Sequence, residues 1–285
     1  MKFFILAGGY GKRAEPLSLI KPKPAFPLNG VPLVLLMLRQ LRALGCLRGF
    51  VNLHHLGEQV VAAAGTDAGI RFIEEKKLGG SRVLRQALPF FSDWLLAVNG
   101  DTFLEIPMDE LQRKASDPGV DGVLVVRRDS RGRYARLRCT GDEFLGSVPA
   151  GAGGGGWMYA GAALFRKRAV EKIGEANFFA SIRKNRLRFK VVRYDGLWLD
   201  VGTPASYFQA NWEYMAHGPR IRVNSLSPQV KISARARVER SVIWENTRIG
   251  PGVRLAGCIV TGNLKLENAC HSGQIVSTLG VFPLR

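Results

Sequence analysis

Short apolar runs and helical patterns alternate along the first two thirds of the chain. Phe3–Leu6 is a continuous apolar run, as expected of a strand buried on both faces of a parallel sheet. Val31–Leu44 is apolar on a helical period and is followed by Gly45, a residue type that commonly ends helices. The same reasoning predicts further strands over 49–53, 70–74, 94–98, 122–128 and 157–165, and helices over 57–64, 82–88 and 204–215.

This order of strand, helix and strand predicts an α/β fold with a Rossmann-like, mostly parallel sheet. Residues 133–148 alternate weakly instead and contain the turn sequence Thr140-Gly141-Asp142, which predicts a β-hairpin. In an open parallel sheet, ligands bind outside the carboxyl ends of the strands. We therefore expect functional residues in the loops that follow the predicted strands.

From Val223 the period of the apolar residues changes to six. Ile243, Ile249 and Leu255 follow one another at this spacing. A six-residue apolar period without helix formers is typical of a left-handed β-helix, here a short one of two or three coils. We therefore expect a larger domain over 1–219 and a short left-handed β-helix over 220–285. Because the edges of such a helix need covering, we also expect a homo-oligomer that forms through this repeat.

The composition limits the kinds of protein that the chain can be. No apolar run reaches the roughly 18 residues of a membrane helix, and Phe3–Ala7 is too short for the core of a signal peptide. The four cysteines form no Cys-x-x-Cys pair, which favours a reduced, cytoplasmic protein over a disulfide or zinc scaffold. The formal net charge of +18 suits an enzyme that attracts anionic substrates, or a nucleic-acid-binding protein. Because the basic residues are dispersed and no recognition motif is found, we expect no nucleic-acid partner and no membrane partner.

The glycines after the first predicted strand indicate a phosphate-binding loop. Gly8, Gly9 and Gly11 allow the backbone to present N–H groups to a ligand, and Arg13 follows closely. Gly9-x-Gly11-x-x-Ala14 also fits the dinucleotide-binding fingerprint, but the prolines at 16, 22, 24 and 27 forbid the long helix that this fingerprint needs. A P-loop is excluded because a leucine occupies the place of its first glycine.

Two aspartates stand beside turn-forming residues. Asp101 follows the apolar run 94–98 and Asn99-Gly100, and Asp200 precedes Val-Gly-Thr-Pro. A carboxylate at the end of a buried strand needs a partner, and a Mg²⁺ ion that bridges phosphate oxygens is one candidate. The other candidate is the set of backbone N–H groups in the aspartate's own loop. The residue types alone do not decide between these two roles.

Three blocks near the N-terminus together resemble the signature of the sugar-1-phosphate nucleotidylyltransferases, also called nucleotide-sugar pyrophosphorylases. The family pattern is LAGGxGxR, then PL(S/T), then PKP, and this chain has Leu6–Arg13, Pro16-Leu17-Ser18 and Pro22-Lys23-Pro24. Residues 99–102 resemble the family's metal-binding Gly-Asp motif, and 198–204 resemble its Trp-x-Asp-Val-Gly-Thr-Pro block. The resemblance implies a nucleotidyltransferase catalytic domain over 1–219. Such an enzyme makes a nucleotide sugar and pyrophosphate from a nucleoside triphosphate and a sugar 1-phosphate.

The resemblance also implies roles for individual residues. Arg13 is expected to hold the β and γ phosphates and Lys23 the α-phosphate, both as catalytic residues. Asp101 and Asp200 are expected to hold Mg²⁺, and Gly161 and Asp200 are expected at the sugar. The implied nucleotide-binding residues are Leu6, Ala7, Gly8, Gly9, Gly11, Arg13, Glu74, Gly79, Asn99 and Gly100.

Departures from the family pattern leave the substrates open. Residues 80–82 read Gly-Ser-Arg where the family has Thr-Ala-Gly beside the nucleobase. No Glu-Lys-Pro precedes the strand 157–165, so Arg136, Arg138 or Lys190 is expected to replace its lysine on the sugar phosphate. GTP with mannose or heptose 1-phosphate is the favoured substrate pair. The alternatives are a uridylyl- or thymidylyltransferase on another sugar 1-phosphate, and a catalytically silent regulatory homologue.

Overall fold

The computed structural model describes residues 1–130, 132–149, 155–174, 177–218 and 223–284. The chain forms two compact units. The first unit comprises Met1–Gly9, Met37–Val61 and Thr66–Trp198. The second unit comprises Tyr10–Leu36, Ala62–Gly65 and Leu199–Arg285. The expected domain boundary between residues 219 and 220 lies outside the described residues and stays a prediction.

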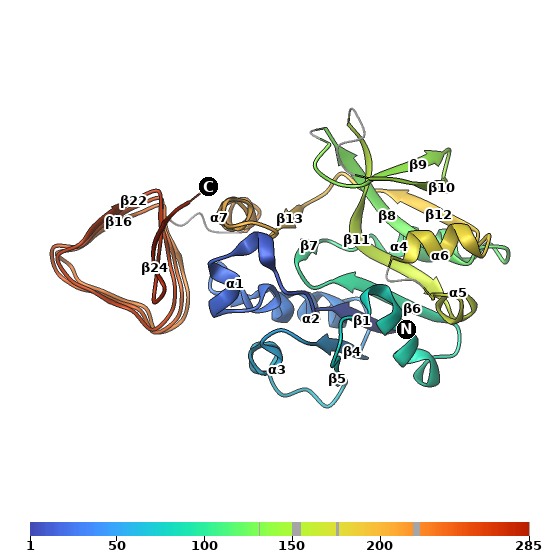
Figure 1. Ribbon diagram of the computed structural model, residues 1–285, viewed down its shortest axis with the longest axis horizontal. Helices are drawn as coiled ribbons and strands as arrows, with labels where there is room; N and C mark the ends of the chain where they lie inside the picture. Colours follow the sequence, from blue (N-terminus) through green and yellow to red (C-terminus); the bar gives the residue numbers. More distant parts are fainter. Residues whose placement is uncertain (131, 150–154, 175–176, 219–222, 285) are drawn as a thin grey trace. The chain divides into compact units, whose positions relative to one another are not determined.

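A nine-stranded sheet is the centre of the first unit (Figure 1). Its strands, in spatial order, are β5 (Ile70–Glu74), β4 (Arg48–Leu53), β1 (Lys2–Leu6), β6 (Trp94–Asn99), β11 (Gly156–Arg166), β8 (Gly122–Asp129), β12 (Phe189–Arg193), β10 (Glu143–Val148) and β9 (Arg136–Thr140). β5, β4, β1 and β6 are mutually parallel, and β8 is parallel to β12. β11 runs antiparallel to both β6 and β8, so these two strands also point the same way. The carboxyl ends of β1, β4, β6 and β8 therefore lie at one edge of the sheet.

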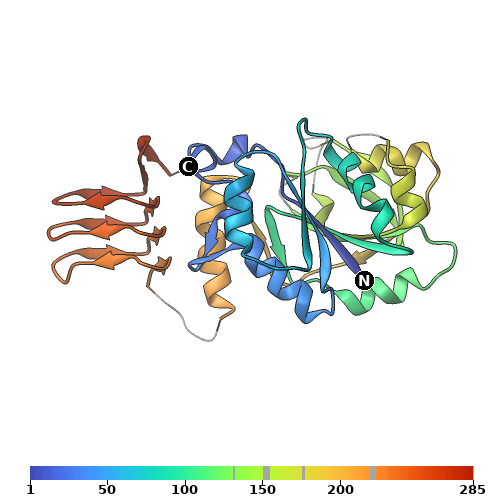
Figure 2. The ribbon, with the colours of Figure 1, turned by 90° about the horizontal axis from the view of Figure 1, so that it is seen from below.

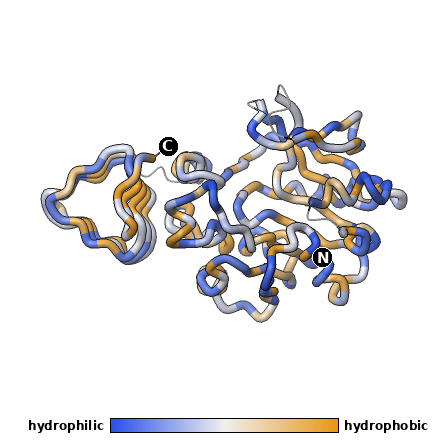
Figure 3. Tube along the Cα trace, viewed as in Figure 1, coloured by the Kyte–Doolittle hydropathy of each residue, from blue (hydrophilic) through white to orange (hydrophobic). Residues whose placement is uncertain are grey.

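The pattern of the sequence predicted eight of these strands correctly, and β12 was missed. β4 and β5 form over the expected residues, and β9 and β10 form the expected hairpin around Gly141, which has a positive φ of 56°. The strands at the centre of the sheet are coloured as hydrophobic along most of their length (Figure 3). Burial on both faces explains why they read as continuous apolar runs.

Helical segments cover one face of the sheet. Apolar side chains of η3 (Gly80–Phe90), α5 (Lys167–Glu171) and α6 (Phe178–Lys184) pack in one core with Phe4 of β1 and Leu124 of β8, both 0% exposed. The predicted helix over 82–88 forms as part of the 3-10 segment η3, which also contains Pro89. The other segments of this part of the chain are α2 (Leu33–Ala43), α3 (Gly57–Ala64), β7 (Thr102–Leu104), α4 (Met108–Ala115) and β13 (Trp198–Asp200). None of the helices in the described ranges is long and apolar enough to span a bilayer.

The second unit begins with the proline-rich segment that follows the glycines. No long helix opens there, as the prolines predicted. The segment consists of η1 (Lys12–Ala14), α1 (Leu17–Ile20), η2 (Lys23–Ala25), β2 (Pro27–Leu28) and β3 (Val31–Pro32). α7 (Pro204–Ala216) also belongs to this unit, and Thr203 and Ser206 form a capping box at its start. Pro204 occupies the first turn of α7, where a missing N–H costs no hydrogen bond.

The C-terminal residues form a parallel β-helix of three coils, consistent with the left-handed helix that the six-residue period predicts (Figures 1 and 2). Ser225 pairs with Val242 and Val242 with Ile259, so each of these coils takes 17 residues. The first side contains β14 (Ser225–Leu226), β17 (Val242–Ile243), β20 (Ile259–Val260), β23 (Gln274–Ser277) and the antiparallel β24 (Gly280–Pro283). The second contains β15 (Lys231–Ile232), β18 (Arg248–Ile249) and β21 (Lys265–Leu266), and the third contains β16 (Arg237–Glu239), β19 (Arg254–Ala256) and β22 (Cys270–Ser272).

Within the second unit, the β-helix packs on the proline-rich segment and α7. Trp244 is 0% exposed, and its ring lies 5.4 Å from that of Phe26. Its Nε1 donates a hydrogen bond to the Tyr207 hydroxyl at 2.9 Å, and that hydroxyl donates to the Pro27 carbonyl at 2.7 Å. Lys21 forms an ion pair with Glu245 at 2.7 Å. The repeat is therefore joined to the segment that contains Lys23 by buried aromatic contacts.

Candidate functional site

The ends of β1 and β6 meet at the carboxyl edge of the sheet. The Gly100 N–H donates to the Leu6 carbonyl at 2.8 Å. A Cβ at Gly100 would lie 2.7 Å from that carbonyl oxygen and 3.0 Å from the Ala7 Cα, so only glycine fits between the strands. The structure thus brings the predicted residues Leu6, Ala7 and Gly100 together, with Asp101 next in the chain.

A buried hydrogen-bond network holds the start of the glycine loop. Asn52, at the end of β4 and 4% exposed, accepts a hydrogen bond from the Ala7 N–H at 2.6 Å. The Asn52 amide donates to the Glu75 carboxylate at 2.5 Å, and the same carboxylate accepts from the Gly79 N–H at 3.0 Å. A Cβ at Gly8 would lie 2.6 Å from the Asn52 Nδ2. Two buried side chains therefore link the glycine loop to the loop that contains Gly79.

The acid in this network is Glu75, a residue that the sequence analysis missed. Glu74, the predicted nucleotide-binding acid, is exposed at the end of β5, whereas Glu75 is 6% exposed. Neighbouring residues at a strand end point to opposite sides, so a one-residue difference decides which acid turns inward. The available signal was Asn52, a polar residue among the apolar residues Phe50, Val51 and Leu53 of β4, because a buried amide requires a partner.

Gly161 lies beside the end of β6. Its φ is +100°, and the pairing of β11 with β8 is irregular between Tyr159 and Ala163. A Cβ at Gly161 would lie 3.4 Å from the Cβ atoms of Asn99 and Thr102. The structure therefore brings Gly161 and Asn99 together, as expected for two residues of one site.

In the second unit, Gly11 and Lys23 lie against each other. Gly11 has a φ of +70°, and a Cβ there would lie 2.9 Å from the Ser18 Cβ and 3.2 Å from the Lys23 Cε. Lys23 is 8% exposed, whereas Lys12 is exposed. The lysine between the two prolines is thus held by packing.

Arg13 and Asp200 lie on either side of Gly202, also in the second unit. The Asp200 carboxylate accepts a hydrogen bond from the Gly202 N–H at 3.0 Å. A Cβ at Gly202 would lie 2.8 Å from an Asp200 carboxylate oxygen and 3.3 Å from an Arg13 guanidinium nitrogen. Because Gly202 has no side chain, the Asp200 carboxylate and the Arg13 guanidinium can both lie against its backbone.

No group of three or more His, Cys, Asp or Glu side chains suited to a metal ion occurs in the described ranges. A metal ion held by the protein alone would need such a group. Mg²⁺ commonly takes only one or two carboxylates and completes its shell with phosphate oxygens and water. Asp101 and Asp200, each partly exposed, fit that kind of ligand.

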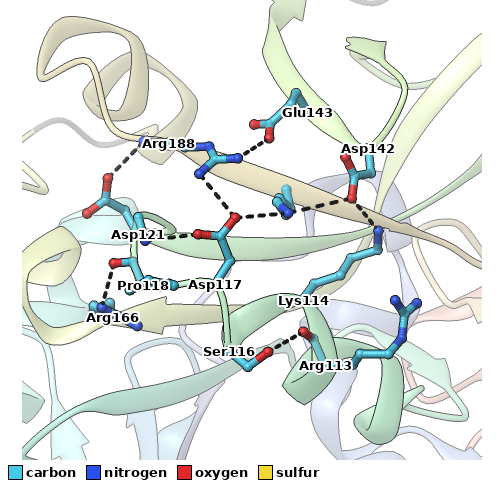
Figure 4. Close-up of polar contacts among 12 residues, drawn as sticks. Arg113, Lys114, Ser116, Asp117, Pro118, Asp121, Asp142, Glu143, Arg166 and Arg188 are labelled. Atoms are coloured by element: carbon cyan, nitrogen blue, oxygen red, sulfur yellow. Dashed lines mark hydrogen bonds and ion pairs between the residues drawn. The ribbon is translucent and has the colours of Figure 1, made fainter.

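Lys190, one candidate for the sugar phosphate, is neutralised by two aspartates, one just after α4 and one just before β10. Figure 4 shows both, Asp117 and Asp142, in a cluster of charged side chains. The Lys190 ammonium lies 3.1 Å from Asp117 and 3.9 Å from Asp142. Asp142 also bonds to Lys114 at 2.7 Å, and this bond lowers the pKa of Asp142. Lys190 is paired in register with Val123 near the start of β8, at the end remote from the carboxyl edge. Its position does not suit the predicted role.

The parallel sheet edge with its glycine loop defines the class as a nucleotide-binding α/β protein. Residues 3–183 match the family described as "MobA-like NTP transferase domain", and residues 213–275 match "GlmU-like, C-terminal hexapeptide". The first match covers more than half of the chain, so this protein belongs to the MobA-like NTP transferase domain family.

Named relatives extend over most of the chain. The present chain is 25% identical to mannose-1-phosphate guanylyltransferase 1 of Arabidopsis thaliana, over 98% of this chain and 88% of that protein. It is 28% identical to the N-acetylmuramate alpha-1-phosphate uridylyltransferase of Neisseria meningitidis serogroup B, over 71% of this chain and 94% of that protein. The crystal structure of HddC from Yersinia pseudotuberculosis aligns with a TM-score of 0.64 at 21% identity, over 75% of this chain and 99% of that one. That likeness shows a shared fold.

Proposed function

We propose that this protein transfers a nucleotidyl group from a nucleoside triphosphate to a sugar 1-phosphate. The observation that carries the proposal is the glycine loop at the carboxyl edge, held by the buried Asn52–Glu75 pair. The names of the relatives support the same reaction class. We further propose GTP with mannose or heptose 1-phosphate as the substrate pair, with UTP or dTTP and another sugar 1-phosphate as the alternative.

The proposed reaction is an in-line displacement at the α-phosphorus. An oxygen of the sugar phosphate forms a new bond to the α-phosphorus. The bond between the α-phosphorus and the oxygen that bridges the α and β phosphates breaks, and pyrophosphate leaves with the electron pair of that bond. A phosphate monoester has a second pKa of about 6, so the nucleophile is already largely a dianion at neutral pH and needs no general base. The protein must instead hold two anions in line and neutralise the charge on the leaving group.

Named residues supply these two functions in the proposal. Arg13 binds the β and γ phosphates, and Lys23 binds the α-phosphate from a packed, proline-flanked segment. Backbone N–H groups of the glycine loop contribute further donors. Asp101 and Asp200 are proposed as carboxylate ligands of Mg²⁺, which when bound would neutralise phosphate charge.

The remaining predicted residues are proposed to bind the base and the sugar. Residues 6–9 and Gly79 would contact the nucleotide, and Glu75 would position both loops from behind. Glu74 is exposed, so we propose for it at most an outer contact with the nucleotide. Asn99 would contact the nucleotide, and Gly161, which lies beside it, would contact the sugar.

A pyrophosphate-release assay tests the proposed function. The purified chain is incubated with Mg²⁺, each of the four common nucleoside triphosphates and a panel of sugar 1-phosphates. Release that requires both substrates supports the proposal and identifies the pair. Absence of release with every pair would refute it and favour the catalytically silent homologue.

We also propose a cytoplasmic homo-oligomer that associates through the C-terminal repeat. The six-residue repeat forms a β-helix whose terminal coils have strand edges, and such edges favour association with a second copy. Light scattering on the full chain gives its mass in solution, and a monomer mass at all concentrations would exclude the oligomer.

A further inference from the structure

Arg127 lies near the carboxyl end of β8, at the same sheet edge as the glycine loop. It is partly exposed, and its guanidinium carbon lies 4.8 Å from the centre of the Trp198 ring. The Tyr134 ring meets Trp198 edge-on, with centroids 5.8 Å apart and an interplanar angle of 87°. The stacked ring restricts the plane in which Arg127 can present its N–H groups.

Arg127 has no acidic partner among the described residues, unlike Lys114 and Lys190 of the same unit. Lys114, 14% exposed, pairs with Asp142, and Lys190, 17% exposed, pairs with Asp117. No carboxylate of the described ranges lies within 4.0 Å of the Arg127 guanidinium. Withdrawing a cation from water without a counter-charge is unfavourable, so such a group is suited to bind an anionic ligand.

The surroundings of Arg127 indicate which ligand this is. The Trp198 Nε1 donates a hydrogen bond to the Ala160 carbonyl at 2.9 Å. Ala160 precedes Gly161, which lies beside Asn99 at the end of β6. A single indole ring therefore connects the Arg127 guanidinium to the strand proposed to face the sugar.

We propose that Arg127 binds the phosphate of the sugar 1-phosphate, an inference that rests on the proposed nucleotidyl transfer. A guanidinium presents two parallel N–H donors that match two phosphate oxygens, so one side chain can both neutralise and orient the nucleophile. The strand that precedes β11 in the chain, β10, has no Lys or Arg that could replace the family's lysine. Lys190 is already paired with carboxylates. In this proposal Arg127 takes the role for which the sequence analysis considered Arg136, Arg138 and Lys190.

The experiment compares Arg127→Met, Arg127→Lys and a matched control, Arg128→Met. Arg128 is the next residue on β8, and its guanidinium carbon lies 4.4 Å from the centre of the Trp157 ring. Both methionine variants therefore lose one positive charge and one cation–aromatic contact from the same strand, on opposite faces. Steady-state kinetics are measured with each substrate varied in turn, after circular dichroism has shown that the variants are folded.

Arg127→Met is expected to raise the KM for the sugar 1-phosphate about tenfold to a hundredfold, the usual effect of losing hydrogen bonds to a charged group. The KM for the triphosphate should stay within about twofold, and Arg128→Met should leave both values unchanged. Arg127→Lys should recover part of the loss, because it restores the charge without the planar pair of donors.

Other outcomes would overturn the assignment. An unchanged KM for the sugar 1-phosphate in Arg127→Met, or an equal increase in Arg128→Met, excludes Arg127 as the phosphate ligand. A defect confined to sugars that carry a second anionic group would show that Arg127 binds that group and not the 1-phosphate. If the parent protein turns over no substrate pair, the proposed function itself has failed, and that result is obtained before any variant is made.

Discussion

Gly8→Ala should weaken the folded state, whereas Gly9→Ala, one residue further along the same loop, should not. A Cβ at Gly8 would lie 2.6 Å from the Asn52 Nδ2, well inside an ordinary contact of at least 3.4 Å. A Cβ at Gly9 would meet no atom within 4 Å. The two variants therefore add the same methyl group to one loop, but only one of them meets an obstacle.

The size of the effect follows from what Asn52 would have to give up. Its amide group bonds to the Ala7 N–H and to the Glu75 carboxylate, so it cannot move aside with both bonds intact. Losing one hydrogen bond to a charged partner costs about 1.5–3 kcal/mol. The alanine recovers about 0.4–1 kcal/mol by restricting the unfolded chain. Gly8→Ala is thus expected to lower the free energy of unfolding by about 0.5–2.5 kcal/mol, and Gly9→Ala to leave it equal or slightly higher.

Urea unfolding followed by tryptophan fluorescence measures both variants against the parent. With an m-value of about 2 kcal/mol/M, the Gly8→Ala midpoint should fall by roughly 0.3–1.3 M. An Asn52→Ala background removes the obstructing amide, so the Gly8→Ala effect should largely disappear there. Equal midpoints for the two single variants, or an undiminished Gly8→Ala effect in the Asn52→Ala background, would refute the reasoning.

Three further predictions concern the proposed catalytic residues and the join to the β-helix. Asp101→Asn and Asp200→Asn should each remove most turnover while the protein stays folded, and removal of Mg²⁺ with a chelator should inactivate the parent equally. Near-normal kcat at saturating Mg²⁺ in either variant would exclude that residue as a ligand. Lys23→Ala should lower kcat/KM on the order of a hundredfold, because Lys23 is packed beside Gly11, whereas exposed Lys12→Ala should act only through long-range attraction and lose its effect in high salt. Equal losses in the two lysine variants would contradict a specific role for Lys23. Trp244→Phe should destabilise the protein by about 1–3 kcal/mol, because it leaves the buried Tyr207 hydroxyl without one donor and leaves a cavity. Thermal melting would measure this loss, and an unchanged melting temperature would show that the contact does not stabilise the unit.

The sequence alone was sufficient for the class of fold, for most strands of the sheet and for the C-terminal repeat. Burial on both faces of a parallel strand requires a continuous apolar run, and the coils of a β-helix require an apolar residue at each inward position. The local order of apolar residues reveals both requirements. Examples are the run Phe3–Leu6 and the six-residue spacing of Ile243, Ile249 and Leu255. The glycine loop could be found in the same way, because the positive φ of Gly11 and the close approach of Asn52 at Gly8 favour glycine at these positions.

Only the tertiary structure decided which side chains complete the site. Glu75 and not Glu74 turns inward, because the partner that it requires, Asn52, lies on the adjacent strand 23 residues earlier in the chain. Lys190 is paired with Asp117, and Arg127 stacks on Trp198, through contacts between elements that no local pattern records. Backbone conformation and burial depend on a few neighbouring residues and so leave a local signal. The partner of a buried charge depends on which strands lie side by side, and therefore appears only once the chain has folded.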